Sequence, residues 1–285
     1  MSQTSPAGSA PHPDDPAPPA TEATEATEAI PDCSNCGQPL AAAGEGARYC
    51  PSCGQRVTEG RLTLRQLARA LEEHLLPGGR GFLHTVLALL RSPGGVVREY
   101  TGGRRRAYVN PLSYLFVTAA TSLVLFNLIG GFDTDQMRAQ LAANAEATQP
   151  GISAAQIERS VEVQVKMFQH ATTLSLLLGI PLTLFLRLTF WRTLNTAESL
   201  VFSLYLLGQV FVLDLATYLL FLLTEDVTWH TATTQIIYLV TAIWFGATFQ
   251  RPRWLGALKA LAAFLLAFLV FAVAVTTALS LYLRA

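Results

Sequence analysis

The chain has few charged residues, and cysteine occurs in only one short segment. Of its 285 residues, 14% are charged, and the mean hydropathy is +0.35. This composition is unusual for a water-soluble protein and is typical of chains that insert into membranes. All four cysteines lie between residues 33 and 53, which excludes a disulfide framework over the rest of the chain.

Recognisable catalytic motifs are also missing. The sequence contains no Gly-rich phosphate loop, no serine nucleophile elbow and no HExxH motif. Its apolar segments contain no pair of acidic residues that could share acid and base roles. We therefore expect that the protein is not an enzyme. The first residues also lack the basic and apolar regions of a secretory signal peptide.

The first 32 residues lack Lys and Arg but contain six acidic residues. Residues 1–31 are Pro-rich and include the repeat PAPPATEATEATEAI, which offers almost nothing to bury, so we expect a disordered acidic leader. Residues 56–106 have the opposite charge, with ten Arg and four acidic residues. Basic character beside an apolar region favours contact with an anionic cytoplasmic leaflet over nucleic acid.

Residues 32–56 contain the pattern Cys33-x2-Cys36-x13-Cys50-x2-Cys53, in which CGQ follows each pair. Two CxxC turns allow four thiolates to converge tetrahedrally on one ion, and this spacing predicts a zinc ribbon with a structural Zn²⁺. Rubredoxin-type iron and a redox dithiol are the alternatives. Such a ribbon would either dock a cytoplasmic protein or cap the helices beneath it.

Residues 57–110 are amphipathic. Thr63 and Gln66 form a capping-box pattern before the first helix, GFLHTVLALLR predicts a second, and Ser92-Pro93 begins a third that stops at Gly102. These helices are too short to cross a bilayer, which needs ~20 apolar residues. We expect them on the membrane surface or on the cytoplasmic ends of the spans.

The basic run GGRRRAYVNP joins these helices to the first span. Arg104, Arg105 and Arg106 are predicted to anchor the chain at lipid headgroups and to signal its orientation, with Asn110 as the cap of the span. A specific site for an anionic lipid or a phosphate is the alternative.

Five apolar segments predict an all-α transmembrane domain at 111–285. They cover residues 111–129, 171–190, 199–223, 231–249 and 255–283. With the N-terminus inside, arginines gather in the cytoplasmic loops, so the positive-inside rule places the C-terminus outside. The long external loop has Ile157, Val161, Val165 and Phe168 at helical spacing, and we expect it to extend the second span outward.

Asp214 lies near the middle of the third predicted span, where a carboxylate is costly. Gly179 and Pro181 interrupt the second span at a similar depth, and the proline frees a carbonyl near Leu177. Asp214 would either donate an interhelical hydrogen bond to such a group or form a proton or substrate site at the midplane.

Other polar residues of the spans are predicted to play smaller parts. Gln209 and Tyr218 lie on the same span as Asp214 and fit either interpretation. His170 and His230 fall at the external edge, where we expect them in the membrane interface.

The order of motifs resembles an uncharacterised family of bacterial inner-membrane proteins with an N-terminal zinc ribbon, catalogued as a domain of unknown function. The resemblance covers CSNCGQ, YCPSCGQR, LTLRQL and GFLHTVLALLRSPGGVVREYTGGRRRAYVNPLSYLFV, and the later segments match only as hydrophobic helices. Its landmarks fall on Pro93, Gly94, Tyr100, Gly103, Arg104, Asn110 and Pro111. It implies the architecture and a multi-pass protein of the bacterial inner membrane, and no activity.

Together these patterns predict a membrane-tethered zinc-ribbon protein that docks a cytoplasmic partner. A small transporter or channel with its site around Asp214 is the first alternative, and a membrane enzyme of unknown chemistry is the second.

Overall fold

The computed structural model describes residues 32–40, 48–57, 61–73, 79–128, 134–148, 151, 153–224 and 227–282. Over these ranges the chain is mostly helical and has no β-strand, which confirms the predicted fold class. The leader predicted at residues 1–31 lies outside the described residues.

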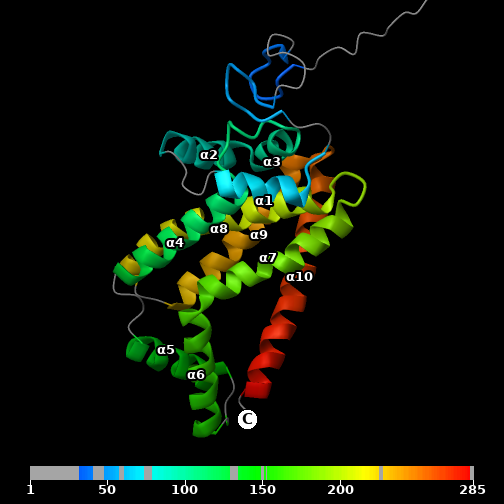
Figure 1. Ribbon diagram of the computed structural model, residues 1–285. Helices are drawn as coiled ribbons and strands as arrows, with labels where there is room; N and C mark the ends of the chain where they lie inside the picture. Colours follow the sequence, from blue (N-terminus) through cyan, green and yellow to red (C-terminus); the bar gives the residue numbers. More distant parts are fainter. Residues whose placement is uncertain are drawn as a thin grey trace, which may run out of the picture.

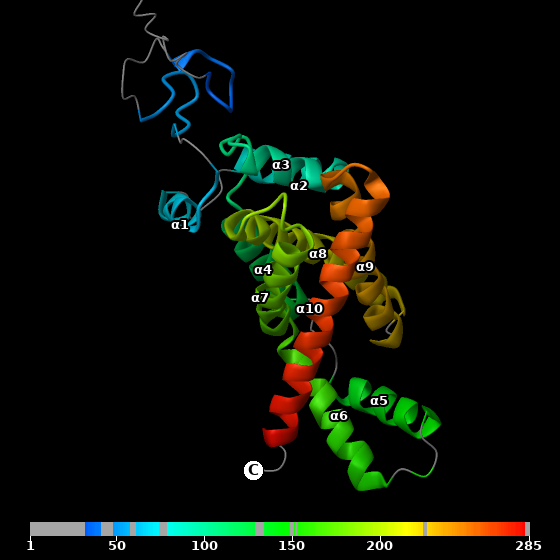
Figure 2. The ribbon, with the colours of Figure 1, turned by 90° about the vertical axis from the view of Figure 1, so that its right-hand side faces the viewer.

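The helices form layers (Figure 1). Below the ribbon lies a collar of three short helices: α1 (Leu64–Glu73), α2 (Gly79–Arg91) and α3 (Pro93–Thr101). The bundle below it contains α4 (Pro111–Leu128), α7 (Ala171–Thr189), α8 (Thr196–Thr224), α9 (Val227–Phe249) and α10 (Arg253–Tyr282). A hairpin of α5 (Thr134–Thr148) and α6 (Ala154–Gln169) lies at the end opposite the ribbon (Figure 2).

Four helices among the described residues are long and apolar enough to cross a membrane, namely α7, α8, α9 and α10. The predicted first span corresponds to α4, whose apolar stretch, Pro111–Leu125, is shorter. An 18-residue helix is about 27 Å long, slightly less than the ~30 Å hydrocarbon core. α4 nevertheless runs parallel to α8 from the collar end, since Tyr114 binds Gln209 and Ser122 binds Tyr218.

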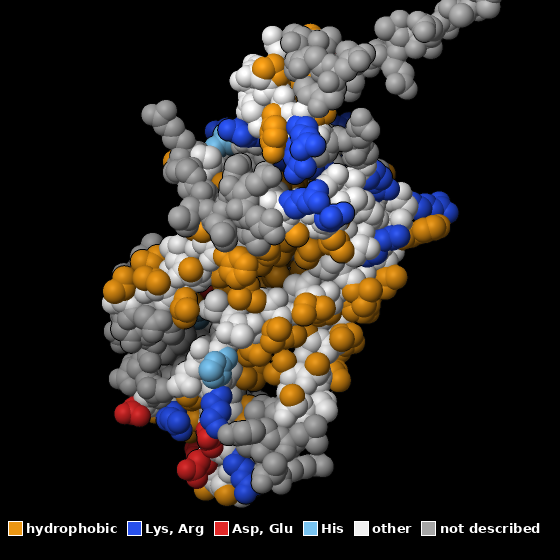
Figure 3. Space-filling view, viewed as in Figure 1, with side chains coloured by type: hydrophobic (Ala, Val, Ile, Leu, Met, Phe, Trp, Pro, Cys, Tyr) orange, Lys and Arg blue, Asp and Glu red, His pale blue; other side chains and the backbone are white. Residues whose placement is uncertain are grey.

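Helix α8 is the centre of the bundle. Its apolar stretch is 67% buried, compared with 22% in α7, 28% in α9 and 22% in α10. Phe202 of α8 packs against Phe190, Phe245 and Phe249, which follow or belong to the neighbouring helices. The outward faces of α7 and α10 carry many exposed leucines and valines, and apolar side chains gather over this part of the molecule (Figure 3), as expected of a lipid-facing surface.

Glycines allow two close helix contacts. A Cβ on Gly256 of α10 would lie 2.1 Å from the carbonyl oxygen of Gly246 on α9, so these backbones touch directly. A Cβ on Gly94 of α3 would lie 2.2 Å from the backbone nitrogen of Phe249. The collar therefore rests on the end of α9 through a position where no side chain fits.

The α5–α6 hairpin has a small core of its own. Ile157, Val161 and Val165 of α6 are buried against α5. Helix α6 leads into α7 through His170, whose backbone N–H donates to the carbonyl of Lys166. The predicted amphipathic extension of the second span is therefore present, and α5 covers its apolar face.

Candidate metal centre and its attachment to the membrane helices

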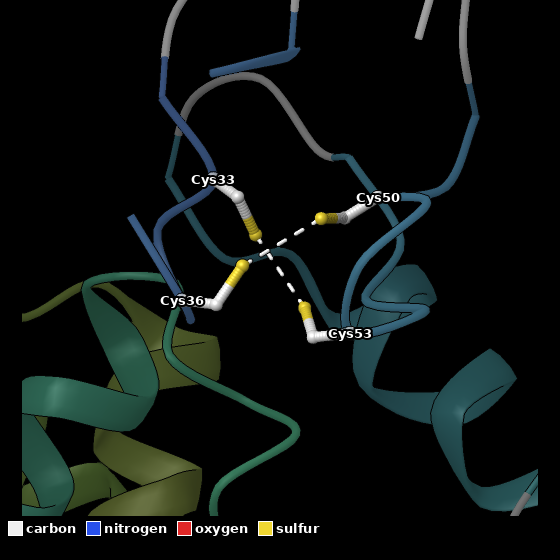
Figure 4. A group of neighbouring side chains, drawn as sticks. All are labelled: Cys33, Cys36, Cys50 and Cys53. Atoms are coloured by element: carbon white, nitrogen blue, oxygen red, sulfur yellow. Dashed lines mark hydrogen bonds between the residues drawn. The ribbon is translucent and has the colours of Figure 1, made fainter. Parts of the chain in front are cut away.

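The four cysteine sulfurs converge on one point (Figure 4). Cys33 Sγ lies 3.7 Å from Cys53 Sγ, Cys36 Sγ lies 3.7 Å from Cys50 Sγ, and all four sulfurs lie within 4.8 Å of one another. Zn–S bonds of 2.3 Å in a tetrahedron give S···S distances of about 3.8 Å, whereas a disulfide needs about 2.05 Å. The four thiols thus form a possible metal site and not a pair of disulfides.

The backbone of the two CxxC turns repeats the same geometry. In the first, Cys33 N–H donates to the Gln38 carbonyl, and Gly37 N–H donates to the Cys33 carbonyl. In the second, Cys50, Gln55 and Gly54 make the equivalent bonds. Gly37 and Gly54 have φ of +73° and +66°, a conformation that favours glycine. This requirement explains the glycine that follows each second cysteine.

Both turns contact the loop between α3 and α4, and the second makes most of the bonds. Ser34 of the first turn donates to the Gly103 carbonyl at 3.1 Å. Gln55 is buried, and its side-chain amide donates to Ser34 Oγ at 2.9 Å and to the carbonyl of Gly103. Its Oε1 accepts from the backbone N–H groups of Arg105 at 3.2 Å and Arg106 at 3.1 Å. A Cβ on Gly103, which has φ of +110°, would lie 2.8 Å from Ser34 Oγ. Gln55 therefore fastens the ribbon to the loop between α3 and α4.

The three arginines of this loop all contact protein groups. Arg104 pairs with Glu99 at 3.0 Å, and Arg106 donates to the Gly54 carbonyl at 3.1 Å. Burial lowers the pKa of the Arg105 guanidinium, which lies near Tyr100. Burial, followed by a hydrogen bond to Glu99, raises the pKa of the neighbouring Tyr108 to about 12. The run thus contacts the ribbon through the Arg106 side chain and through the backbone N–H groups of Arg105 and Arg106.

A second attachment follows the ribbon along the chain. Arg61 forms an ion pair with Glu198 at the start of α8 and donates to the Thr193 carbonyl at 2.8 Å. Glu198 accepts from Asn195 N–H at 2.8 Å, and Asn195 Oδ1 accepts from Glu198 N–H at 2.9 Å, so the two residues form a reciprocal capping box at the start of α8. Asn195 Nδ2 also donates to the Leu62 carbonyl at 2.9 Å.

The collar is bonded to the bundle at several points. Gly94 N–H donates to Thr248 Oγ1 at 2.8 Å. Arg98 donates to the carbonyls of Thr248 and Phe249, a favourable place for a cation at the C-terminal end of α9. Tyr205 of α8 donates to the Val109 carbonyl at 2.6 Å. The loop between α3 and α4 thus contacts the ribbon through Gly103–Arg106 and the apolar helix α8 through Val109.

Two predicted helix caps of this region have different outcomes. Asn110 Oδ1 accepts from Leu112 N–H at 2.9 Å, so Asn110 caps α4 as predicted. Ser92 occupies the position before α3, with Pro93 as the first helical residue, but its side chain makes no capping hydrogen bond.

The intramembrane residues lie differently from the prediction. Asp214 accepts from Thr217 Oγ1 at 2.9 Å and from Thr234 Oγ1 of α9 at 2.8 Å. Gly179 faces Leu207 instead, and among the described residues no hydrogen bond joins Asp214 to the proline kink in α7. Asp214 faces α9, whereas the kinked part of α7 packs against another part of α8. Similar depth in the membrane, which is all that the sequence provides, does not show which helix faces are in contact.

The structure adds His230 to this group. His230 is buried among the helices, and its ring stacks on Tyr218 with centroids 5.0 Å apart. Its predicted position at the depth of the membrane interface stays a prediction. Tyr218 contacts Asp214 and Ser122. Gln209 belongs elsewhere, because its Oε1 accepts from Tyr114. The cluster lies near Trp229, where the apolar stretch of α9 begins, and so closer to the end opposite the ribbon than to the midplane.

Comparison with known proteins gives a family match over part of the chain. Residues 80–123 match the family model described as "Protein of unknown function (DUF3667)". The match covers nearly all of α2, all of α3, the loop of Gly103–Arg106 (the arginine loop) and most of α4. It contains all seven landmark positions of the predicted resemblance. No curated protein and no solved structure matches. The segment that connects the ribbon to the apolar helices is therefore similar to the DUF3667 family, as the sequence motifs predicted.

Proposed function

We propose that the protein is a membrane-anchored zinc-ribbon protein whose ribbon binds a cytoplasmic protein partner. One observation carries the proposal: the collar lies between the ribbon and the bundle, and the ribbon projects beyond it (Figure 1). The contacts of its Cys turns are to the loop of Gly103–Arg106. A ribbon that only capped the helices would be expected to cover their ends, a place that the collar already occupies.

Zinc is the metal that we propose for the four thiolates. A site with four cysteine ligands and no open position is typical of structural zinc, and its binding would supply the folding energy that so small a core lacks. Iron would use the same ligands, so the metal must be identified in the purified protein.

An exposed tyrosine provides a contact point for the partner. Tyr49 is 50% exposed and directly precedes the buried Cys50, so the metal site would hold it in place. Tyrosine is enriched in the cores of protein interfaces because it offers a large rigid surface with one polar group. The proposal includes no catalytic step.

The proposed location is the bacterial inner membrane, with the ribbon in the cytoplasm and the C-terminus outside. The ribbon and the C-terminal end of α10 lie at opposite ends of the molecule (Figure 1), so a bundle that spans the membrane would have them on opposite sides. The arginines near the ribbon end favour the cytoplasm for that side. Trp191 and Trp254 near the collar end, and Trp229 near the other, are exposed, as expected at the two interfaces.

The test is site-specific photocrosslinking in native membranes. A photoreactive residue replaces Tyr49 in one variant and Trp229, at the other end of the molecule, in the control. We expect a discrete adduct with a cytoplasmic protein from position 49 only, and its loss in Cys33→Ser/Cys36→Ser at equal membrane abundance. Adducts that are the same at both positions, or that persist without the metal ligands, would refute docking by the ribbon.

A further inference from the structure

Four polar side chains form a ladder between α8 and α9. Asp214 and Tyr218 are four residues apart on α8, and His230 and Thr234 are four residues apart on α9, so each pair lies on one helix face. The helices run antiparallel: Thr234 donates to Asp214 at 2.8 Å, and His230 stacks on Tyr218 at 5.0 Å. Tyr218 also hydrogen-bonds Asp214, which makes the four side chains one connected group.

The group is buried within apolar segments. Asp214 is 9% exposed and His230 is 8% exposed. Among the described residues, no Lys or Arg forms an ion pair with Asp214. An ionised carboxylate beside a neutral imidazole would leave one net negative charge in a medium of low dielectric, which is costly. One added proton makes the group neutral, whether the proton is on the carboxylate or on the imidazole.

Few other titratable groups face Asp214. Within the described residues they are Tyr218 on α8, and His230 and Tyr238 on α9. Helix α4 contributes Ser122, which does not titrate, and Tyr238 itself donates to Ser175 of α7 at 3.0 Å. A carboxyl group and an imidazole exchange protons at lower pH than a phenol, so Asp214 and His230 are the two members able to bind the proton.

We propose that Asp214, Tyr218 and His230 form a proton-binding site within the membrane, in which the carboxylate and the imidazole bind one proton between them. Tyr218 contacts both groups, by a hydrogen bond to Asp214 and by ring stacking on His230, and the hydroxyl of Thr234 donates to the carboxylate. The site is separate from the ribbon in space and in its elements, so proton binding does not depend on the partner proposed above.

Nuclear magnetic resonance of the full chain in lipid nanodiscs tests the site directly. Histidine labelled at Cε1 reports the titration of each imidazole as the pH changes. We expect the proton affinity of His230 to fall about tenfold or more in Asp214→Asn and to stay near wild type in Asp214→Glu. His84 is the matched control, because it is exposed and stacks on Tyr108 in a similar way, with centroids 5.7 Å apart. An unchanged His230 titration in Asp214→Asn would overturn the proposal.

A second measurement covers the case in which Asp214→Asn does not fold. The carboxyl band of Asp214 is followed by infrared difference spectroscopy with isotope-labelled aspartate, in wild type, His230→Gln and His84→Gln. We expect the titration of this band to move in His230→Gln and to be unaffected in His84→Gln. A band that titrates identically in all three proteins would show that the two groups are independent, and the proposal would fail.

Discussion

The side-chain amide of Gln55 donates a hydrogen bond to the backbone carbonyl of Gly103, across the boundary between the ribbon and the helices. The first CxxC turn has a glutamine at the equivalent place, Gln38, but that residue is exposed. The two CGQ sequences are identical, and their backbone turns are the same. Both turns contact the loop of Gly103–Arg106, the first through Ser34, but only the glutamine of the second turn lies buried against it.

Gln55→Ala should loosen the ribbon from the collar and leave its metal site intact. The substitution removes the acceptor of two backbone N–H groups, those of Arg105 and Arg106, and the donor to Gly103. A net hydrogen bond contributes about 1 kcal/mol, so we expect these amides to exchange hydrogen about tenfold faster or more. Hydrogen–deuterium exchange with mass spectrometry measures this change.

Gln38→Ala is the matched control, since it alters the same motif without touching the loop. It should leave exchange at Arg105 and Arg106 as in wild type, and both variants should bind as much metal as wild type. Equal exchange in Gln55→Ala and Gln38→Ala would contradict the attachment described here.

Removal of the metal ligands should unfold the ribbon without displacing the bundle. Cys33→Ser/Cys36→Ser eliminates two of four thiolates, and so small a core does not fold without its ion. We expect about one zinc per wild-type chain and none in the variant by elemental analysis. Cobalt exchanged into the wild type should give the absorption of a tetrahedral thiolate site. Stoichiometric iron in the purified protein would reject zinc in favour of a rubredoxin-type centre.

The sequence predicted the elements of this protein better than their contacts. Periodicity and length located the helices, because burial against lipid or a collar leaves a pattern along one chain. The CxxC spacing predicted that Cys33, Cys36, Cys50 and Cys53 converge, because each turn positions its own pair. Composition did not show, in contrast, that the distant Gln55 binds the backbone of the arginine run. That these arginines anchor the chain at lipid headgroups stays a prediction.

The polar cluster shows the same limit. The sequence predicted that Asp214 faces other helices, because a carboxylate exposed to lipid in an apolar span is costly, and Asp214 is indeed buried. Residues at similar depth suggested the kink at Pro181 as the partner of Asp214. Which side chains meet also depends on how each helix is rotated about its own axis, and depth does not show this. The available signal was the antiparallel order of α8 and α9, in which Asp214 lies opposite Thr234 and Tyr218 opposite His230.

Gly94→Ala should destabilise the contact between the collar and α9. The new methyl group would lie 2.2 Å from a backbone nitrogen and 2.5 Å from a carbonyl oxygen of α9, and backbone atoms cannot move aside cheaply. Overpacking of this kind costs about 1–3 kcal/mol or more. Titration with a denaturing detergent, followed by circular dichroism, measures the loss.

Gly81→Ala provides the comparison, because a Cβ at that position meets nothing within 4 Å. Alanine is favoured over glycine in a helix by up to about 1 kcal/mol, so this variant should be as stable as wild type or more stable. If Gly94→Ala and Gly81→Ala unfold at the same detergent concentration, then α3 does not pack against the backbone of α9 at Gly94 as described.

Arg61 and Glu198 should be energetically coupled, because the carboxylate that Arg61 pairs with is buried and also caps α8. The side chain of Glu198 is 6% exposed and that of Arg61 is 60% exposed, so loss of the arginine leaves a charge that water reaches poorly. We expect Arg61→Ala and Glu198→Ala each to destabilise the protein by about 2 kcal/mol, and the double variant by at least about 1 kcal/mol less than their sum. The matched pair is Glu162 and Lys166 on α6, which are 2.9 Å apart with both side chains exposed and should show no measurable coupling. If the Arg61–Glu198 cycle is as additive as the Glu162–Lys166 cycle, then the ion pair does not hold the linker after the ribbon to the start of α8.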